Sequence, residues 1–242
     1  MGKRDEGACS IMKKTVVLFS GGLDSTVLLS YLKKQDEGVD AKIFALSVDY
    51  GQRHSKELRA AAQIADSLEI ERRYVDLRGI QCLIRGSSQT SDIEVPEGHY
   101  EDESMKVTVV PNRNMIMLSL ALGWAISLEA EFIAYAAHAG DHAIYPDCRQ
   151  EFINAFREVA KLAHYYPVHL LSPFANKSKA DIVRIGYDVN APMHLTWSCY
   201  KGKDLHCGKC GTCVERKEAF QLAGIIDPTK YEEEEKECLK VT

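Results

Sequence analysis

The sequence predicts an α/β fold, in which a doubly wound parallel sheet is followed by a small cysteine-rich module that binds metal. Up to residue 190, short apolar runs alternate with segments of helical period, as in parallel sheets covered by helices on both faces. Beyond residue 190, four of the eight cysteines fall within one short stretch. We therefore expect a main domain at 14–190, a metal module at 191–225, and tails at 1–13 and 226–242.

The first half of the main domain alternates strands and helices. The run TVVLF at 15–19 is apolar throughout and ends at Ser-Gly-Gly, which predicts a buried strand. The segment 24–34 has apolar residues at helical spacing and leads toward a glycine. A second apolar run at 43–48 predicts a strand, the alanine-rich segment 54–68 predicts a helix, and 73–77 predicts a third strand.

The second half begins after a stretch rich in Gly, Ser, Pro and charge, 78–105, which predicts a long loop. Loops of this length are usually functional lids or flexible segments. Hydrophobic periodicity then returns. The expected elements are helices at 114–129, 149–164, 179–187 and 214–222 and strands at 131–136 and 169–171.

Composition and charge exclude several classes of protein. Asp and Glu number 35 against 30 Lys and Arg, so the net charge of −5 argues against direct nucleic-acid binding through a broad basic surface. The first dozen residues lack the apolar core of a signal peptide. The most apolar window, 115–130, is shorter than the roughly 20 residues of a membrane span. We expect a cytoplasmic protein without membrane contact, and eight cysteines are too few for a disulfide scaffold.

The string SGGLDS, between the first strand and the first helix, predicts a phosphate-binding loop. Two glycines allow successive backbone N–H groups to converge on an anion, and the helix N-terminus adds positive potential. The string lacks the Gly-Lys-Ser/Thr of the Walker loop and the spacing of dinucleotide-binding folds. The alternative is a glycine turn that caps a helix. The residues expected to bind nucleotide are Phe19, Ser20, Gly21, Gly22, Leu23, Asp24, Ser25 and Thr26.

Cys199, Cys207, Cys210 and Cys213 form the pattern C-x7-C-x2-C-x2-C. Four thiolates complete a tetrahedral Zn²⁺ shell, which leaves no open position for water and indicates a structural site. The same spacing is also compatible with iron–sulfur ligation. His206 lies beside the cysteines, and we expect it to be an exposed neighbour rather than a ligand.

Several strings together resemble one family. SGGLDS resembles the PP-loop of ATP pyrophosphatases, which have an adenine nucleotide alpha hydrolase-like fold. SVDYGQRH at 47–54, YPDCR at 145–149, and TWSCY at 196–200 followed by HCGKCGTC at 206–213 complete the set. In this order they closely resemble the 7-cyano-7-deazaguanine synthase family over about residues 14–222.

The resemblance implies a reaction. The family converts 7-carboxy-7-deazaguanine and ammonia to the 7-cyano compound, using ATP twice, through an adenylated carboxylate and then an amide. The product feeds queuosine or archaeosine modification of tRNA. The resemblance also implies Mg²⁺ with ATP, zinc rather than an iron–sulfur cluster, and a homodimer. The alternatives are another PP-loop enzyme that amidates a different acid or thiolates tRNA, and a non-enzymatic nucleotide sensor.

Candidate catalytic residues follow from the chemistry of adenylation, which needs positive charge at the triphosphate. Asp24 is a natural partner for Mg²⁺. Arg113 lies in Pro-Asn-Arg-Asn, which resembles the family's Pro-Gly-Arg-Asn, with Asn112 in place of the glycine. Lys179 resembles the lysine that follows the family's late strand, with Lys177 as its rival.

Candidate substrate residues come from the strings YPDCR and SVDYGQRH. A deazaguanine ring presents an N–H and an amino group side by side, which match one carboxylate, so we expect Asp147 to bind the base. We expect Arg149 to meet the substrate carboxylate, and Tyr50 follows the second strand, where doubly wound sheets bind ligands. Ile144 replaces a glycine found in many members. Cys9, Cys82, Cys148 and Cys238 are expected to be buried thiols without a catalytic role.

Overall fold

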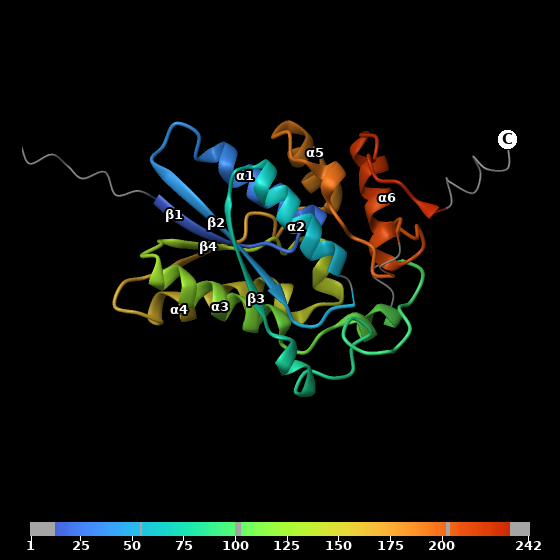
Figure 1. The fold of residues 1–242 in the computed structure, drawn as a ribbon, viewed down its shortest axis with the longest axis horizontal. Helices are drawn as coiled ribbons and strands as arrows, with labels where there is room; N and C mark the ends of the chain where they lie inside the picture. Colours follow the sequence, from blue (N-terminus) through green and yellow to red (C-terminus); the bar gives the residue numbers. More distant parts are fainter. Residues whose placement is uncertain (1–12, 54, 100–102, 202–203, 233–242) are drawn as a thin grey trace, which may run out of the picture.

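The computed structural model describes residues 13–53, 55–99, 103–201 and 204–232. Its centre is a five-stranded sheet in the order β3-β2-β1-β4-β5, in which all neighbouring strands are parallel (Figure 1). The order reverses between β1 and β4, and such a switch point is where doubly wound sheets bind ligands. The strands are β1 Lys13–Leu18, β2 Ala41–Asp49, β3 Glu71–Asp76, β4 Phe132–Ala134 and β5 His169–Leu171.

Helices cover both faces of the sheet (Figure 1). One face carries α1 Leu23–Gln35, α2 Ser55–Ser67 and α5 Lys179–Asp188, with α6 Gly211–Ala223 against α5. The other face carries α3 Arg113–Ser127 and α4 Gln150–Leu162. The sequence therefore predicted the α/β fold and its parallel sheet correctly.

The buried parts of β1 and β2 are mostly apolar because both faces of these strands are covered. Val16 lies in a core cluster with residues of α3 and α4, whereas the adjacent Val17 lies in the cluster with α1. Both valines are fully buried, as successive side chains of a strand point to opposite faces. The strand expected at 131–136 is shorter than predicted, because the chain leaves the sheet after Ala134.

The described parts of the long loop expected at 78–105 have local structure. They contain the 3-10 turn Arg78–Cys82, and a second 3-10 turn follows at Glu103–Thr108. Ser87, Ser88 and Gln89 are buried in them. These residues therefore pack as part of the main domain.

The remaining cysteines differ from one another. Cys148 is buried, as predicted, but Cys82 is exposed, so its prediction as a buried thiol was wrong. Cys82 ends the short surface turn Arg78–Cys82, which has no buried residue, and the exposed Leu83 follows it. No local pattern in the sequence distinguishes this surface turn from a buried one. Cys9 and Cys238 lie outside the described residues.

The described part of the stretch after 225 packs against the cysteine module. Arg216 of α6 is fully buried, and its guanidinium pairs with Asp227 at 3.1 Å. The Tyr231 hydroxyl donates to the same carboxylate at 2.7 Å. Residues 227–231 therefore pack against α6, although the sequence predicts a tail there.

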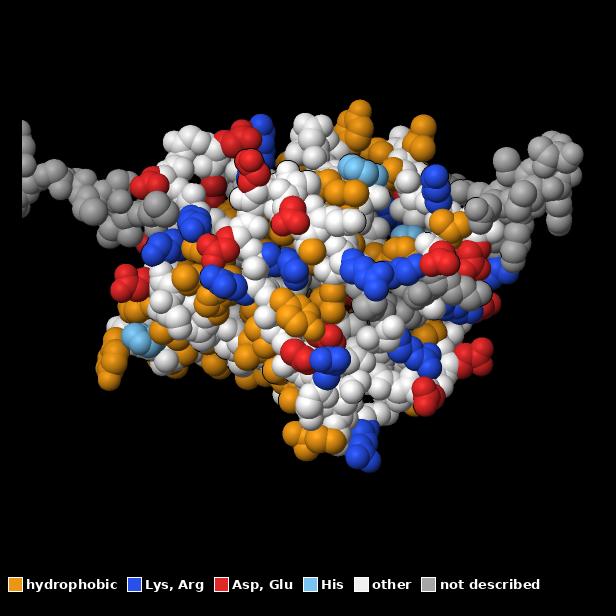
Figure 2. All heavy atoms as spheres, viewed as in Figure 1, with side chains coloured by type: hydrophobic (Ala, Val, Ile, Leu, Met, Phe, Trp, Pro, Cys, Tyr) orange, Lys and Arg blue, Asp and Glu red, His pale blue; other side chains and the backbone are white. Residues whose placement is uncertain are grey.

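Charge is mixed on the surface. On the face shown in Figure 2, Lys and Arg side chains are interspersed with Asp and Glu and do not form one broad patch. No helix in the described ranges is long and apolar enough to cross a membrane.

Alanine substitution should have opposite effects on stability at two helical glycines, one packed between α5 and α1 and one facing open space. A Cβ on Gly186 of α5 would lie 2.8 Å from both Val27 Cγ2 and Met193 Sδ, whereas a Cβ on Gly123 of α3 would meet nothing within 4 Å. Gly186→Ala should lower the free energy of unfolding by about 1–3 kcal/mol through overpacking. Gly123→Ala should raise it by up to about 1 kcal/mol. Urea unfolding of both variants measures this, and equal effects of the two would contradict the packing described.

Candidate active site

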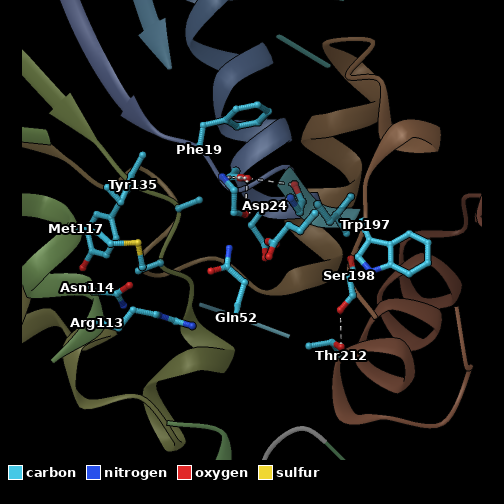
Figure 3. Close-up of a pocket in the computed structure, with 18 of the residues that line it drawn as sticks. Phe19, Asp24, Gln52, Arg113, Asn114, Met117, Tyr135, Trp197, Ser198 and Thr212 are labelled. Carbon is cyan, nitrogen blue, oxygen red and sulfur yellow. Dashed lines mark hydrogen bonds between the residues drawn. The ribbon is translucent and has the colours of Figure 1, made fainter. Parts of the chain in front are cut away.

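A cavity of about 240 Å³ lies at the carboxyl ends of β1, β2 and β4, beside the switch point between β1 and β4 (Figure 3). Its walls come from the glycine loop after β1, the turn after β2, the first turns of α2 and α3, residues 135–137 after β4, the start of α5, and the cysteine module. Segments distant in the sequence thus meet at one site, as expected for a doubly wound sheet.

The glycine loop takes its shape from Gly21. Its φ of +90° suits glycine, and a Cβ there would lie 2.4 Å from the Glu57 carbonyl oxygen and 2.5 Å from the Ala61 nitrogen. The loop therefore packs directly against the backbone of α2. Gly22 N donates to Ser20 Oγ at 3.1 Å, and Ser20 Oγ lies 3.1 Å from Ser25 Oγ.

Six of the eight residues expected to bind nucleotide line the cavity. They are Phe19, Ser20, Gly22, Leu23, Asp24 and Ser25. Gly21 and Thr26 do not line it, because Gly21 faces α2 and Thr26 is fully buried behind the loop. Hydroxyl groups and the N-terminus of α1 thus gather at one wall, which suits an anion.

Lys179 is the centre of a partly buried charge network. Its Nζ lies 2.6 Å from Asp24 Oδ2, 3.3 Å from Glu215 Oε2 and 3.3 Å from His138 Nε2. Burial alone would lower the pKa of Lys179, but the carboxylates of Asp24 and Glu215 hold that pKa above its ordinary value. Lys179 is therefore charged at neutral pH. It lines the cavity, whereas Lys177 does not.

Asp24 presents one free oxygen. Burial alone would raise its pKa, but Lys179 and His138 hold the pKa below the ordinary value, so the carboxylate is ionised. Asp24 Oδ2 pairs with Lys179, while Oδ1 is buried and has no hydrogen-bond partner among the described residues. An orphaned carboxylate oxygen beside an anion-binding loop fits Mg²⁺, which binds through one or two carboxylates and phosphate oxygens.

Arg113 enters the cavity from the first residue of α3 (Figure 3). Asn112, at the position of the family's glycine, has a φ of 57°, a left-handed conformation that asparagine tolerates. The left-handed conformation of Asn112 is therefore one that glycine also adopts readily. The Arg113 guanidinium lies 5.7 Å from the centre of the Tyr145 ring.

Tyr50 and Tyr200 share the Arg113 side of the cavity. Burial raises the pKa of both hydroxyls, so the tyrosines are neutral. A cation among aromatic rings suits a planar, anionic ligand. Tyr50 thus lies where the sequence predicts a substrate residue.

Asp147 and Arg149 do not line the cavity. Asp147 Oδ2 accepts a hydrogen bond from Asn114 N at 2.9 Å, at the start of α3. The exposed Arg149 donates from Nε to the His142 carbonyl oxygen at 2.9 Å. Their contact with substrate stays a prediction. Ile144 is buried in the core cluster between α3 and α4, away from the cavity lining.

The four predicted metal ligands converge. Cys199, Cys207, Cys210 and Cys213 are buried, and their sulfur atoms all lie within 4.8 Å of one another. Backbone N–H groups of residues 201 and 207 donate to Cys199 Sγ, both at 3.4 Å. Such donors stabilise thiolates, the form that binds metal. The donor set therefore fits a single metal centre.

His206 is buried, so its prediction as an exposed neighbour was wrong. Its ring lies against that of Trp197 at a tilt of 41°, with centroids 4.3 Å apart, and Nε2 accepts a hydrogen bond from Ser198 N at 3.1 Å. Burial lowers the pKa of His206 to about 4, so it is neutral. His206 organises the backbone of the module instead of contacting solvent.

The cysteine module is a wall of the cavity. Trp197 N donates to the Gly21 carbonyl oxygen at 3.1 Å, and Thr212 Oγ1 donates to the Ser198 carbonyl oxygen at 2.8 Å. Figure 3 shows Ser198 and Thr212 across the cavity from Arg113. Cys199 itself lines the cavity. A metal that orders the module therefore also shapes the site.

Sequence reasoning missed three carboxylates that line the cavity, Glu57, Asp141 and Glu215. It also missed His138, a buried histidine beside Lys179. Glu57 follows the string SVDYGQRH by three residues, and this closeness was the one available signal. Asp141 and Glu215 carry no local signal, because only the fold brings them to Lys179.

Comparisons with known proteins agree with this site. A family model described as queuosine biosynthesis protein QueC matches residues 14–224. A curated 7-cyano-7-deazaguanine synthase from Hahella chejuensis (strain KCTC 2396) is 51% identical over 222 residues, covering 92% of this chain and 94% of the relative. One from Brucella ovis (strain ATCC 25840 / 63/290 / NCTC 10512) is 52% identical over 222 residues, covering 91% and 94%.

A solved structure shares the fold at low identity. The U34-tRNA thiolase NcsA from Methanococcus maripaludis, with its 4Fe-4S cluster, matches with a TM-score of 0.51 and 14% identity, covering 91% of this chain and 77% of that chain. This likeness supports the fold alone. The family match and the curated relatives extend over nearly the whole chain, and the chain therefore belongs to the family described as queuosine biosynthesis protein QueC.

Proposed function

We propose that the chain converts 7-carboxy-7-deazaguanine and ammonia to 7-cyano-7-deazaguanine, driven by cleavage of ATP to AMP and pyrophosphate. The observation that carries the proposal is the glycine loop with Asp24, Arg113 and Lys179 around one cavity, in a chain about half identical to synthases of that name. The loop and the two cations suit a triphosphate, and the tyrosines beside Arg113 suit a planar carboxylate substrate.

Each catalytic residue has a distinct task in this proposal. Lys179 and Arg113 neutralise charge on the phosphates as pyrophosphate leaves. Asp24 Oδ1 would hold Mg²⁺, which supplies further positive charge at the phosphate oxygens. Adenylation turns the substrate carboxylate into an acyl group that ammonia attacks to form the amide. A second adenylation, at the amide oxygen, allows that oxygen to leave and the nitrile to form.

The substrate residues and the assembly remain part of the proposal. Tyr50 lies at the cavity, and we retain Asp147 and Arg149 as residues that meet the base and the carboxylate. We further propose structural Zn²⁺ at the four cysteines, a homodimer, a cytoplasmic location, and no direct contact with nucleic acid or membrane. The product would feed queuosine or archaeosine biosynthesis.

Incubation of the purified chain with 7-carboxy-7-deazaguanine, ATP, Mg²⁺ and ammonium tests the function, with the 7-cyano product and AMP as the expected outcome. Lys179→Met should lower kcat/KM about 10²–10³-fold, because a preorganised charge at the phosphates is lost. Lys177→Met, whose residue lies outside the cavity lining, is the matched control and should retain activity. The absence of nitrile from the wild type, or equal losses in the two variants, would contradict the proposal.

Elemental analysis tests the metal. The chain should carry one zinc, and Cys213→Ser should lose it and melt at a lower temperature, because structural zinc contributes folding free energy. Cys82→Ser, at an exposed position, should change neither quantity. Stoichiometric iron with visible absorption would instead identify an iron–sulfur cluster and favour the tRNA-thiolating alternative.

A further inference from the structure

Glu57 occupies a position in the cavity that the proposed function leaves without a task. It lies in the first turn of α2, and its side chain lines the cavity. A Cβ placed on Gly22 would lie 3.3 Å from Glu57 Oε1 and 3.2 Å from Ser20 Oγ. The carboxylate of Glu57 is therefore beside the loop that holds the phosphates, where the acyl–phosphate bond would be made and broken.

The other carboxylates of the cavity have cationic or imidazole partners. Asp24 and Glu215 lie 2.6 and 3.3 Å from Lys179, and Asp141 lies 3.5 Å from His138. Around Glu57, no Lys, Arg or His nitrogen of the described residues lies within 4.0 Å. Among the residues that the structure describes, Glu57 is thus the cavity carboxylate without an ion pair.

Burial raises the pKa of Glu215, but that carboxylate is paired with Lys179. The tyrosine, cysteine and lysine side chains of the cavity cannot accept a proton near neutral pH. Burial raises the pKa values of the Tyr50, Tyr135 and Tyr200 hydroxyls and of the Cys148 thiol, so all four remain protonated. Lys179 is also protonated, because its carboxylate neighbours outweigh the effect of burial.

We propose that Glu57 is the proton acceptor for the capture of ammonia by the adenylated substrate, an inference that rests on the proposed function. Adenylation of a carboxylate releases no proton. When ammonia attacks the acyl carbon, the C–N bond forms and the C–O bond to AMP breaks, with its electron pair leaving on AMP. The nitrogen then holds one proton more than the amide can keep, and Glu57 takes that proton.

The surroundings of Glu57 suit this task. Burial raises its pKa to about 7, against the opposing effects of the Ser20 hydroxyl and the Arg113 guanidinium. Asp24 from α1 adds to the rise, and Tyr50 after β2 also faces the carboxyl group. A general base works best when its pKa lies close to the working pH. Glu57 is therefore both available as a base and easily reprotonated.

Glu57→Gln separates proton transfer from adenylation. The variant keeps the shape of the side chain but cannot accept a proton, so nitrile and amide formation should fall about 10²–10⁴-fold. Pyrophosphate exchange into ATP that depends on 7-carboxy-7-deazaguanine should stay within a few-fold of the wild-type rate, which also shows that the variant folds. Glu158→Gln, on the exposed surface of α4, is the matched control.

The pH profile supplies a second readout. At a fixed concentration of un-ionised ammonia, wild-type kcat/KM should fall as the pH drops below about 7, because Glu57 becomes protonated. The Glu57→Gln profile should lose this fall. Wild-type rates and profile in the variant would overturn the inference, as would equal losses of exchange and product formation. Absence of exchange and of product in the wild type would instead refute the proposed function.

Discussion

The position of the glycine loop depends on the absence of a side chain at Gly21. One side of this residue contacts the backbone of α2, where a Cβ would overlap the Glu57 carbonyl oxygen. Its carbonyl group, on another side, accepts the Trp197 N–H that leads into the cysteine module. Gly21 therefore joins the glycine loop to both α2 and the cysteine module. These three parts of the chain form three walls of the cavity.

Charge is the second constraint on the site. The cavity lining has two cations, Arg113 and Lys179, and four carboxylates, namely Asp24, Glu57, Asp141 and Glu215. The triphosphate of the proposed ATP substrate would add further negative charge in a partly desolvated space, where repulsion is strong. A divalent cation at Asp24 would offset part of this charge. Burial, with a smaller contribution from the Asp24 carboxylate, raises the pKa of Glu57 above that of an ordinary glutamate.

Much of the fold could be predicted because the buried strands are apolar on both faces, as at 15–19 and 43–48. The four cysteines and the loop string were recognisable because their ligand or turn chemistry lies within a short span. Glu215 was missed because a lone carboxylate on a helix resembles a solvated face until α5 and α6 are packed together. His206 was misjudged because only the fold shows the aromatic rings of Trp197 and Tyr231 beside it.

Calorimetric titration of Gly21→Ala with ATP and Mg²⁺ tests whether the proposed binding of ATP depends on the packing of the loop against α2. Positive φ strain and the contact at 2.4 Å should displace the loop and weaken ATP binding about tenfold or more. Gly38→Ala is the control, because Gly38 has a φ of 81° but no neighbour within 4 Å of a Cβ. Wild-type ATP affinity in Gly21→Ala would contradict this dependence.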